Sequence, residues 1–147
     1  MTLELSKVKR NIQDHLQEGL LLVVGTGLSI AEGIPSMGQL ADHLKREIPL
    51  KLAPDPAWDQ IVSALDAGDH LEAAMGKVTL KPTTVDKIIA ATAELIFSAE
   101  QKVFSRVLTG TRELPFTFFV KHLFKAGKKF HLITPNYDRL IEFATEA

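Results

Sequence analysis

The chain has no cysteine, one tryptophan, one tyrosine and almost no net charge. Without cysteine it forms no disulfide and offers zinc no thiolate ligand. A net charge of −1 gives no electrostatic reason to expect a nucleic acid or an anionic membrane as a partner. No apolar run is long enough to span a bilayer, and the N-terminal MTLELSKVKR lacks the apolar core of a signal peptide. We therefore expect a cytoplasmic protein with no membrane partner and no direct nucleic-acid partner.

The 147 residues are enough for one domain. Most of the chain shows the apolar periodicity of helices. Apolar residues at a spacing of four predict a first helix through Val8 and Leu16, ended by Gly19 as a left-handed cap. Ser36 and Gln39 have the spacing of a capping box and predict the start of another helix. Its expected apolar face consists of Met37, Leu40, Ala41, Leu44 and Ile48.

The middle and the end of the chain are also expected to be helical. A proline-rich loop is predicted over residues 49–58, followed by two short helices that break at Gly68. A long helix is expected from Thr83 or Thr84 to Gly110, with an apolar stripe. That stripe comprises Val85, Ile88, Ile89, Thr92, Ile96, Ala99, Val103 and Val107. Further helices are predicted from Pro115 to Gly127 and over residues 137–147.

Two short apolar runs predict strands, LLLVV at residues 20–24 and FHLIT at residues 130–134. Such runs are typical of strands buried on both faces of a parallel sheet, so His131 is expected to be a buried core histidine. Strands alternating with helices indicate an α/β fold. Because two parallel strands do not make a stable sheet, we expect the chain to be the front part of a larger domain.

A glycine-rich segment, GTGLSIAEGIPSMG at residues 25–38, follows the first strand directly. Gly25 and Gly27 can adopt positive φ and carry no Cβ, so a phosphate could approach the backbone at the start of the next helix. The dinucleotide fingerprint G-x-G-x-x-G fails at Ile30, and no Gly-Lys-Ser/Thr follows. Taken alone, the segment fits an ordinary strand-to-helix turn as well as a nucleotide site.

The same segment contains GLSIA, which is close to the G-x-S-x-G nucleophile elbow of serine hydrolases. In an elbow the strand runs almost directly into the serine, whereas residues 25–28 separate Ser29 from the strand here. The earlier strands and oxyanion loop of such a hydrolase also have little room before Gly25. The sequence therefore disfavours a serine hydrolase.

Two motifs together resemble the sirtuin superfamily. Residues 25–35 resemble its GAGxSxxxGIP signature, and TPNYD at residues 134–138 resembles its TQNID motif. TPNYD is closer still to the TTNYD of the SIR2-like NADase domains of bacterial antiphage defence proteins. The resemblance covers the two ends of the chain, and residues 49–115 correspond by position to a helical insertion. It implies an incomplete Rossmann-like, sirtuin-type parallel sheet, with residues 1–147 as the N-terminal part of the domain.

The resemblance implies that NAD is the substrate. Four residues would line its diphosphate and adjoining ribose: Gly25, Thr26, Gly27 and Ser29. Ile34 and Pro35 would shape the nicotinamide end, and Asn136 would bind at the nicotinamide ribose, oriented toward water or the ribose hydroxyls. Asp138 would face the nicotinamide pocket or brace the loop. Asn136 and Asp138 are thus the candidate catalytic residues, although both residue types also cap helices and stabilise turns.

Three departures from the family pattern bear on the activity. Ser36, Met37 and Gly38 replace the Asp-Phe-Arg of sirtuin deacetylases, which favours NAD hydrolysis over protein deacylation. Pro135 replaces a Thr or Gln and removes a hydrogen-bond donor. The family's catalytic histidine lies downstream of the Asn-x-Asp motif, and no histidine follows Asp138 here. We expect it in sequence beyond Ala147.

The resemblance predicts an NAD glycohydrolase that acts in antiphage defence as a homo-oligomer or with a defence-complex partner protein. A non-catalytic NAD-binding or assembly module is the first alternative, and an NAD-dependent deacylase the second. The five histidines show no ligand spacing, so no metal site is expected.

Overall fold

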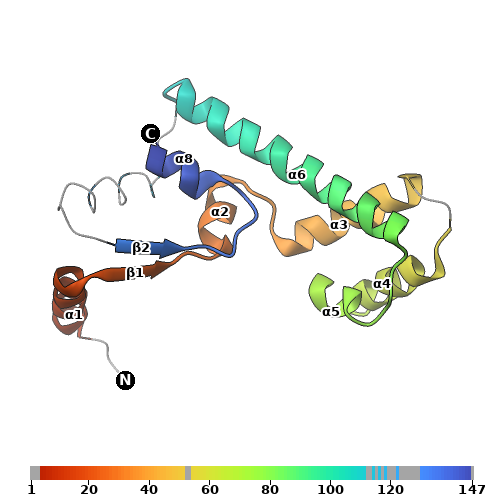
Figure 1. The fold of residues 1–147 in the computed structure, drawn as a ribbon, viewed down its shortest axis with the longest axis horizontal. Coiled ribbons are helices and arrows are strands. Elements are labelled where there is room, and N and C mark those ends of the chain that lie inside the picture. Colours follow the sequence, from red (N-terminus) through yellow and green to blue (C-terminus); the bar gives the residue numbers. More distant parts are fainter. Residues whose placement is uncertain are drawn as a thin grey trace. The chain divides into compact units, whose positions relative to one another are not determined.

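A computed structural model describes residues 4–51, 54–111 and 130–146, together with the single positions 114, 116, 118 and 122. The chain divides into two compact units. The first comprises Met1–Ser29 and Arg106–Ala147, and the second comprises Ile30–Ser105. In the described ranges every element between the two strands is a helix (Figure 1).

The first unit contains a two-stranded parallel sheet. β1 (Leu20–Val23) and β2 (Phe130–Ile133) lie side by side (Figure 1), with Leu20 opposite Phe130 and Val23 opposite Ile133. The N–H of Val24 donates a 2.9 Å hydrogen bond to the Ile133 carbonyl and so extends the pairing past β1. Two parallel strands and a mostly helical remainder confirm a mixed α/β chain, whereas the sirtuin-type sheet stays a prediction.

One face of this sheet is exposed, so the expectation of strands buried on both faces is wrong. Leu21, Val23 and Ile133 are 60%, 70% and 54% exposed, and His131 is also exposed. Alternate strand residues point to one face, and the register pairs Leu21 with His131 and Val23 with Ile133. His131 is therefore a surface residue and not a core histidine. The described helices leave this face uncovered.

In the sequence, helices precede and follow the two strands. α1 (Leu5–Glu18) precedes β1, and Gly19 ends it with φ +116°, as predicted. α2 (Thr26–Glu32) follows β1 after two intervening residues, and α8 (Leu140–Glu146) follows β2. Buried residues of the first unit include Leu140, Ile141 and Ala144, all on α8.

The second unit is a helical bundle with its own core. Its helices are α3 (Met37–Lys51), α4 (Pro56–Asp66), α5 (Leu71–Met75) and most of α6 (Pro82–Leu108). The core cluster consists of Leu40, Ala41, Leu44, Ile48, Trp58, Ile61, Leu71, Ala74, Ile88 and Ala91. The apolar face predicted for α3 is thus buried, except Met37 at its first turn, which is 37% exposed.

The capping box at the start of α3 is confirmed. The N–H of Ser36 donates to Oε1 of Gln39 at 2.8 Å, and the N–H of Gln39 donates to Oγ of Ser36 at 3.3 Å. The predicted loop 49–58 is too long, because α3 continues through Pro49 to Lys51 and α4 already begins at Pro56. Pro49 has no N–H to donate to the preceding turn, and α3 nevertheless includes it in its last turn.

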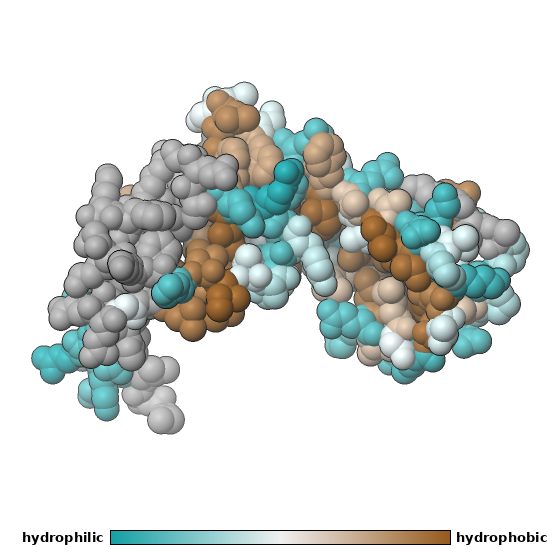
Figure 2. Space-filling view, viewed as in Figure 1, coloured by the Kyte–Doolittle hydropathy of each residue, from teal (hydrophilic) through white to brown (hydrophobic). Residues whose placement is uncertain are grey.

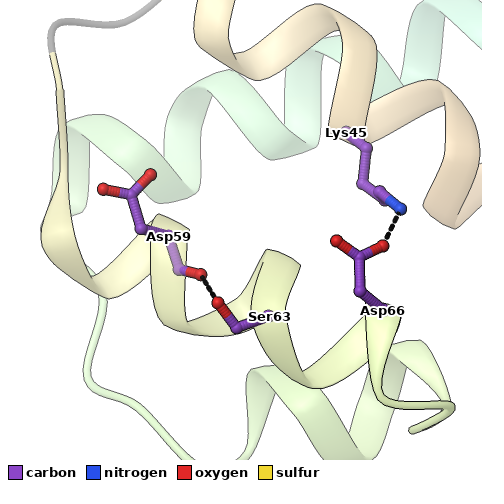
Figure 3. A network of polar contacts seen from close by, with 4 residues as sticks. All are labelled: Lys45, Asp59, Ser63 and Asp66. Carbon is purple, nitrogen blue, oxygen red and sulfur yellow. Dashed lines mark hydrogen bonds and ion pairs between the residues drawn. The ribbon is translucent and has the colours of Figure 1, made fainter.

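Polar contacts occur between the helices of this unit and within one of them. The Lys45 ammonium of α3 forms an ion pair with Asp66 at the end of α4 (Figure 3). On α4 itself, the Ser63 hydroxyl donates to the Asp59 carbonyl at 2.9 Å. Gly68, with φ +98°, separates α4 from α5 as predicted. An exposed ion pair of this kind contributes at most about 1 kcal/mol, so the apolar core dominates the stability of the unit.

The long helix α6 begins one residue before its predicted start and ends before Gly110, whose φ is +69°. The apolar stripe predicted for it is only partly buried, since Ile88 and Val103 are buried but Ile89 is 60% exposed. Figure 2 shows hydrophobic areas reaching the surface among hydrophilic ones. The helix predicted from Pro115 to Gly127 lies largely outside the described residues. No helix in the described ranges is long and apolar enough to cross a membrane.

Candidate functional site

The loop between β1 and α2 carries the first motif. Gly25 and Gly27 are exposed, and neither has positive φ, so the conformational reason predicted for these glycines is wrong. Positive φ occurs instead at Gly33, directly after α2, where it is +104°. A Cβ built on Gly25 or Gly27 would meet no atom of the described residues within 4 Å, apart from the chain neighbours and the adjoining helix backbone. The space beside both glycines is therefore open to a ligand.

The segment after β2 carries the second motif and is held by local hydrogen bonds. The backbone N–H of Asn136 donates to Oγ1 of Thr134 at 3.1 Å. Asp138 is buried, and its Oδ1 accepts the N–H of Leu140 at 3.1 Å, which caps the start of α8. The resemblance implies that Asp138 either faces the nicotinamide pocket or braces the loop, and this contact agrees with bracing of the loop.

Asn136 joins the two motifs. Its Nδ2 donates to Oγ of Ser29 at 2.8 Å and to the carbonyl of Gly25 at 3.3 Å, across 107 and 111 residues of sequence. Because β1 and β2 are parallel neighbours, the loops at their carboxyl ends meet at the same edge of the sheet. Ligands of open α/β sheets bind at this edge. The sheet thus brings Gly25, Ser29 and Asn136 together.

The acceptor of the Asn136 side chain is unsatisfied. Oδ1 is buried and has no hydrogen-bond partner among the described residues. A buried acceptor without a partner costs about 1–3 kcal/mol. A hydroxyl, an N–H group or a water molecule that donates to Oδ1 would recover this free energy. Oδ1 therefore keeps unused hydrogen-bonding capacity for a donor, although it is enclosed in this conformation.

The other predicted site residues have different surroundings. Ser29 is only 1% exposed, so its hydroxyl faces Asn136 rather than solvent, whereas Thr26 is exposed at the first residue of α2. Ile34 and Pro35 belong to the second unit, where Ile34 is buried and Pro35 half-buried. The roles that the resemblance implies for these two residues stay predictions.

Two residues of the second motif were given no individual role in the sequence analysis. The Thr134 hydroxyl oxygen accepts the backbone N–H of Asn136, two residues later, in a side-chain-to-backbone turn that threonine favours. Tyr137 is 79% exposed between two residues with anchored side chains. Tyr137 is the one tyrosine of the chain, and this could have drawn attention to it in the sequence.

No group of three or more histidine, aspartate or glutamate side chains that could hold a metal ion occurs in the part of the chain that the structure describes. Comparisons of the chain with protein-family models, with curated proteins and with solved structures give no match. The two motifs and the contacts between them are therefore the features that point to a function.

Proposed function

We propose that this chain is the NAD-binding part of a SIR2-like NAD glycohydrolase that acts in bacterial antiphage defence. The observation that carries the proposal is the pair of hydrogen bonds from Asn136 to Ser29 and Gly25. These bonds join the two segments that resemble the sirtuin signatures, although more than a hundred residues separate them. An ordinary strand-to-helix turn at residues 25–38 would not require such a partner.

The surroundings of the two glycines support binding of a diphosphate. Gly25 and Gly27 are exposed, and beyond their chain neighbours and the adjoining helix backbone no atom of the described residues lies within 4 Å of the position where a Cβ would stand. A phosphate group can therefore approach the backbone more closely than it could at any other residue type. We propose that the diphosphate of NAD binds beside these glycines, and that its nicotinamide ribose binds toward Asn136.

The proposed reaction is NAD⁺ + H₂O → nicotinamide + ADP-ribose + H⁺. The bond between nicotinamide and ribose breaks through an oxocarbenium-like state, as in glycoside cleavage, and water adds to the ribose carbon. Asn136 Oδ1 would accept a hydrogen bond from the water or from a ribose hydroxyl and orient it. The proton would pass to the histidine that the resemblance requires downstream of Asp138. We therefore propose hydrolysis for the whole polypeptide and NAD binding for this chain.

Nicotinamide release by the full-length protein tests the proposal. Purified protein is incubated with NAD, and nicotinamide is quantified by chromatography for the wild type and for Asn136→Ala. Asn11→Ala is a matched control, because Asn11 is exposed on α1. We expect release by the wild type and the control, and a loss of about 100-fold or more in Asn136→Ala. Equal release by all three proteins would overturn the assignment.

A non-catalytic NAD-binding or assembly module is the second candidate. The contact that favours it is the one from Asp138 to the N–H of Leu140, since a carboxylate that caps α8 has a structural role already. In that case calorimetry would detect NAD binding without nicotinamide release. Release that requires an added acyl-lysine peptide would instead indicate a deacylase. Light scattering with and without NAD would test the homo-oligomer that the resemblance implies.

A further inference from the structure

We infer that Ser29 is a positioning residue, whose buried hydroxyl fixes the Asn136 amide so that only its carbonyl oxygen is left for a ligand. This role differs from lining the diphosphate, which the resemblance implies for Ser29. The effect of Ser29 on activity depends on the NAD hydrolysis proposed above. The orientation of Asn136 can be tested without any activity.

The burial of Ser29 separates it from the exposed part of the loop. Its exposed fraction is 1%, while Gly25, Thr26 and Gly27 before it are all exposed. The Ser29 Oγ lies 2.8 Å from Nδ2 of Asn136, the shorter of the two bonds that this amide donates. Because this hydroxyl is buried, it would affect a ligand by holding Asn136 in position and not by direct contact.

The two bonds also fix which end of the amide is available. A primary amide has two N–H donors, and here Nδ2 has two acceptors, Oγ of Ser29 and the carbonyl of Gly25. Rotation of the amide by 180° would bring Oδ1 against the Gly25 carbonyl, where two acceptors repel each other. The hydroxyl of Ser29 can donate or accept, so the Gly25 carbonyl selects the orientation and Ser29 tightens it.

This orientation restricts the ligand chemistry at Asn136. Nδ2 already donates to two acceptors, and Oδ1 is the side-chain atom without a partner among the residues described. The ligand group that binds there must therefore donate a hydrogen bond, as a ribose hydroxyl or a water molecule does. A phosphate oxygen, which only accepts, is excluded at Asn136 and is left to the open space beside Gly25 and Gly27.

Side-chain amide exchange measures the positioning directly. The 147 residues contain two asparagines, Asn11 and Asn136, and Asn11 lies exposed on α1 as an internal reference. In ¹⁵N-asparagine-labelled full-length protein, the Asn136→Ser variant assigns the Asn136 signals. We expect the Asn136 side-chain protons to exchange at least about tenfold more slowly than those of Asn11. Ser29→Ala should remove most of this protection, and Ser98→Ala, at an exposed site on α6, should not.

Equal exchange of the two wild-type side chains would overturn the inference, and so would full protection in a folded Ser29→Ala variant. If Ser29→Ala does not fold, Ser29→Cys replaces it, because its thiol is a weak acceptor of similar size. That variant should retain partial protection. Circular dichroism reports whether each variant is folded.

A double-mutant cycle on nicotinamide release tests the consequence for catalysis. We expect Ser29→Ala to lower kcat about tenfold while KM changes less than twofold, because ligand contacts remain. Ser29→Ala combined with Asn136→Ala should be no slower than Asn136→Ala alone. Additive losses would mean that Ser29 acts on the ligand independently and would overturn the inference. If the wild type releases no nicotinamide, the proposed hydrolysis fails, and the exchange measurement still decides the role of Ser29.

Discussion

The Thr84 hydroxyl donates a 2.5 Å hydrogen bond to Oδ2 of Asp55, and both side chains are buried. Oδ1 of the same carboxylate accepts the N–H of Ala57 at 3.1 Å and caps α4. One carboxylate therefore links the start of α4 to the first turn of α6. The Thr84 hydroxyl holds the pKa of Asp55 below its usual value, with smaller contributions from the Ala57 N–H and the Lys81 charge, while burial opposes them.

This pKa shift predicts an acid-dependent loss of stability. A carboxyl group with a lowered pKa in the folded state stabilises the protein fully above its unfolded pKa, about 4, and loses that contribution as pH falls through the folded pKa. Thr84→Val removes the largest cause of the shift. We expect Thr84→Val to unfold at lower urea concentration than the wild type at pH 7, and to begin acid unfolding at higher pH. Urea titrations between pH 2 and pH 7 measure both effects.

Thr83→Val is the matched control for this prediction, because Thr83 is the exposed neighbour of Thr84 on α6. It should follow the wild-type curve at every pH. A Thr84→Val variant with the wild-type acid transition would show that Thr84 does not set the pKa of Asp55.

Trp58 provides a second stability test. Its ring is 3% exposed in the core of the second unit, yet its Nε1 has no hydrogen-bond partner among the described residues. Trp58→Phe removes this unsatisfied donor together with some buried area, so we expect a loss below about 1.5 kcal/mol. Trp58→Ala should cost about 3–5 kcal/mol, because it leaves a cavity. Urea unfolding followed by circular dichroism measures both losses, and a Trp58→Phe loss clearly above about 1.5 kcal/mol would mean that Nε1 has a hydrogen-bond partner in solution.

The parts of the fold that the sequence predicted are those set by neighbouring residues. The Ser36–Gln39 box starts α3 through contacts three residues apart, and Gly19, Gly68 and Gly110 end their helices because each has positive φ. Local chemistry suffices for such features. It does not suffice for Pro49, which α3 includes in its last turn although proline usually breaks a helix.

The burial of the strands depends on tertiary contacts, and here prediction from the sequence was wrong. LLLVV and FHLIT are apolar enough for a sheet covered on both sides, but four-residue strands do not show which face is covered. In the candidate site, the resemblance pointed to Ser29 and Asn136 as separate ligand contacts. The hydrogen bond between them depends on the pairing of β1 with β2, which no local pattern encodes.

The capping box of α3 predicts the effect of losing a single hydroxyl. Ser36→Ala removes the acceptor for the Gln39 N–H and should destabilise the protein by about 0.5–2 kcal/mol. Ser63→Ala is the control, since Ser63 is exposed within α4 and donates only to the carbonyl four residues earlier. That contact adds little to a helix, so the control should change stability by less than about 0.5 kcal/mol. Thermal unfolding of both variants measures the difference, and similar losses would contradict a specific role for the cap.

Gly25→Ala separates the fold of the loop from its proposed binding of NAD. Gly25 does not need positive φ, and the added methyl group meets no atom of the described residues within 4 Å beyond the chain neighbours, so we expect stability to change by less than about 0.5 kcal/mol. The same methyl group would occupy the space assigned to the diphosphate, and the dissociation constant for NAD should rise at least about tenfold. Calorimetric titration of the full-length protein with NAD measures it.

Two further glycines serve as controls for that experiment. Gly38→Ala, at an exposed position in α3, should bind NAD like the wild type. Gly19→Ala should instead lower stability by about 1–2 kcal/mol, because φ is +116° at this residue. Unchanged NAD affinity in Gly25→Ala would place the diphosphate elsewhere, since no ligand in contact with this backbone could avoid the new methyl group.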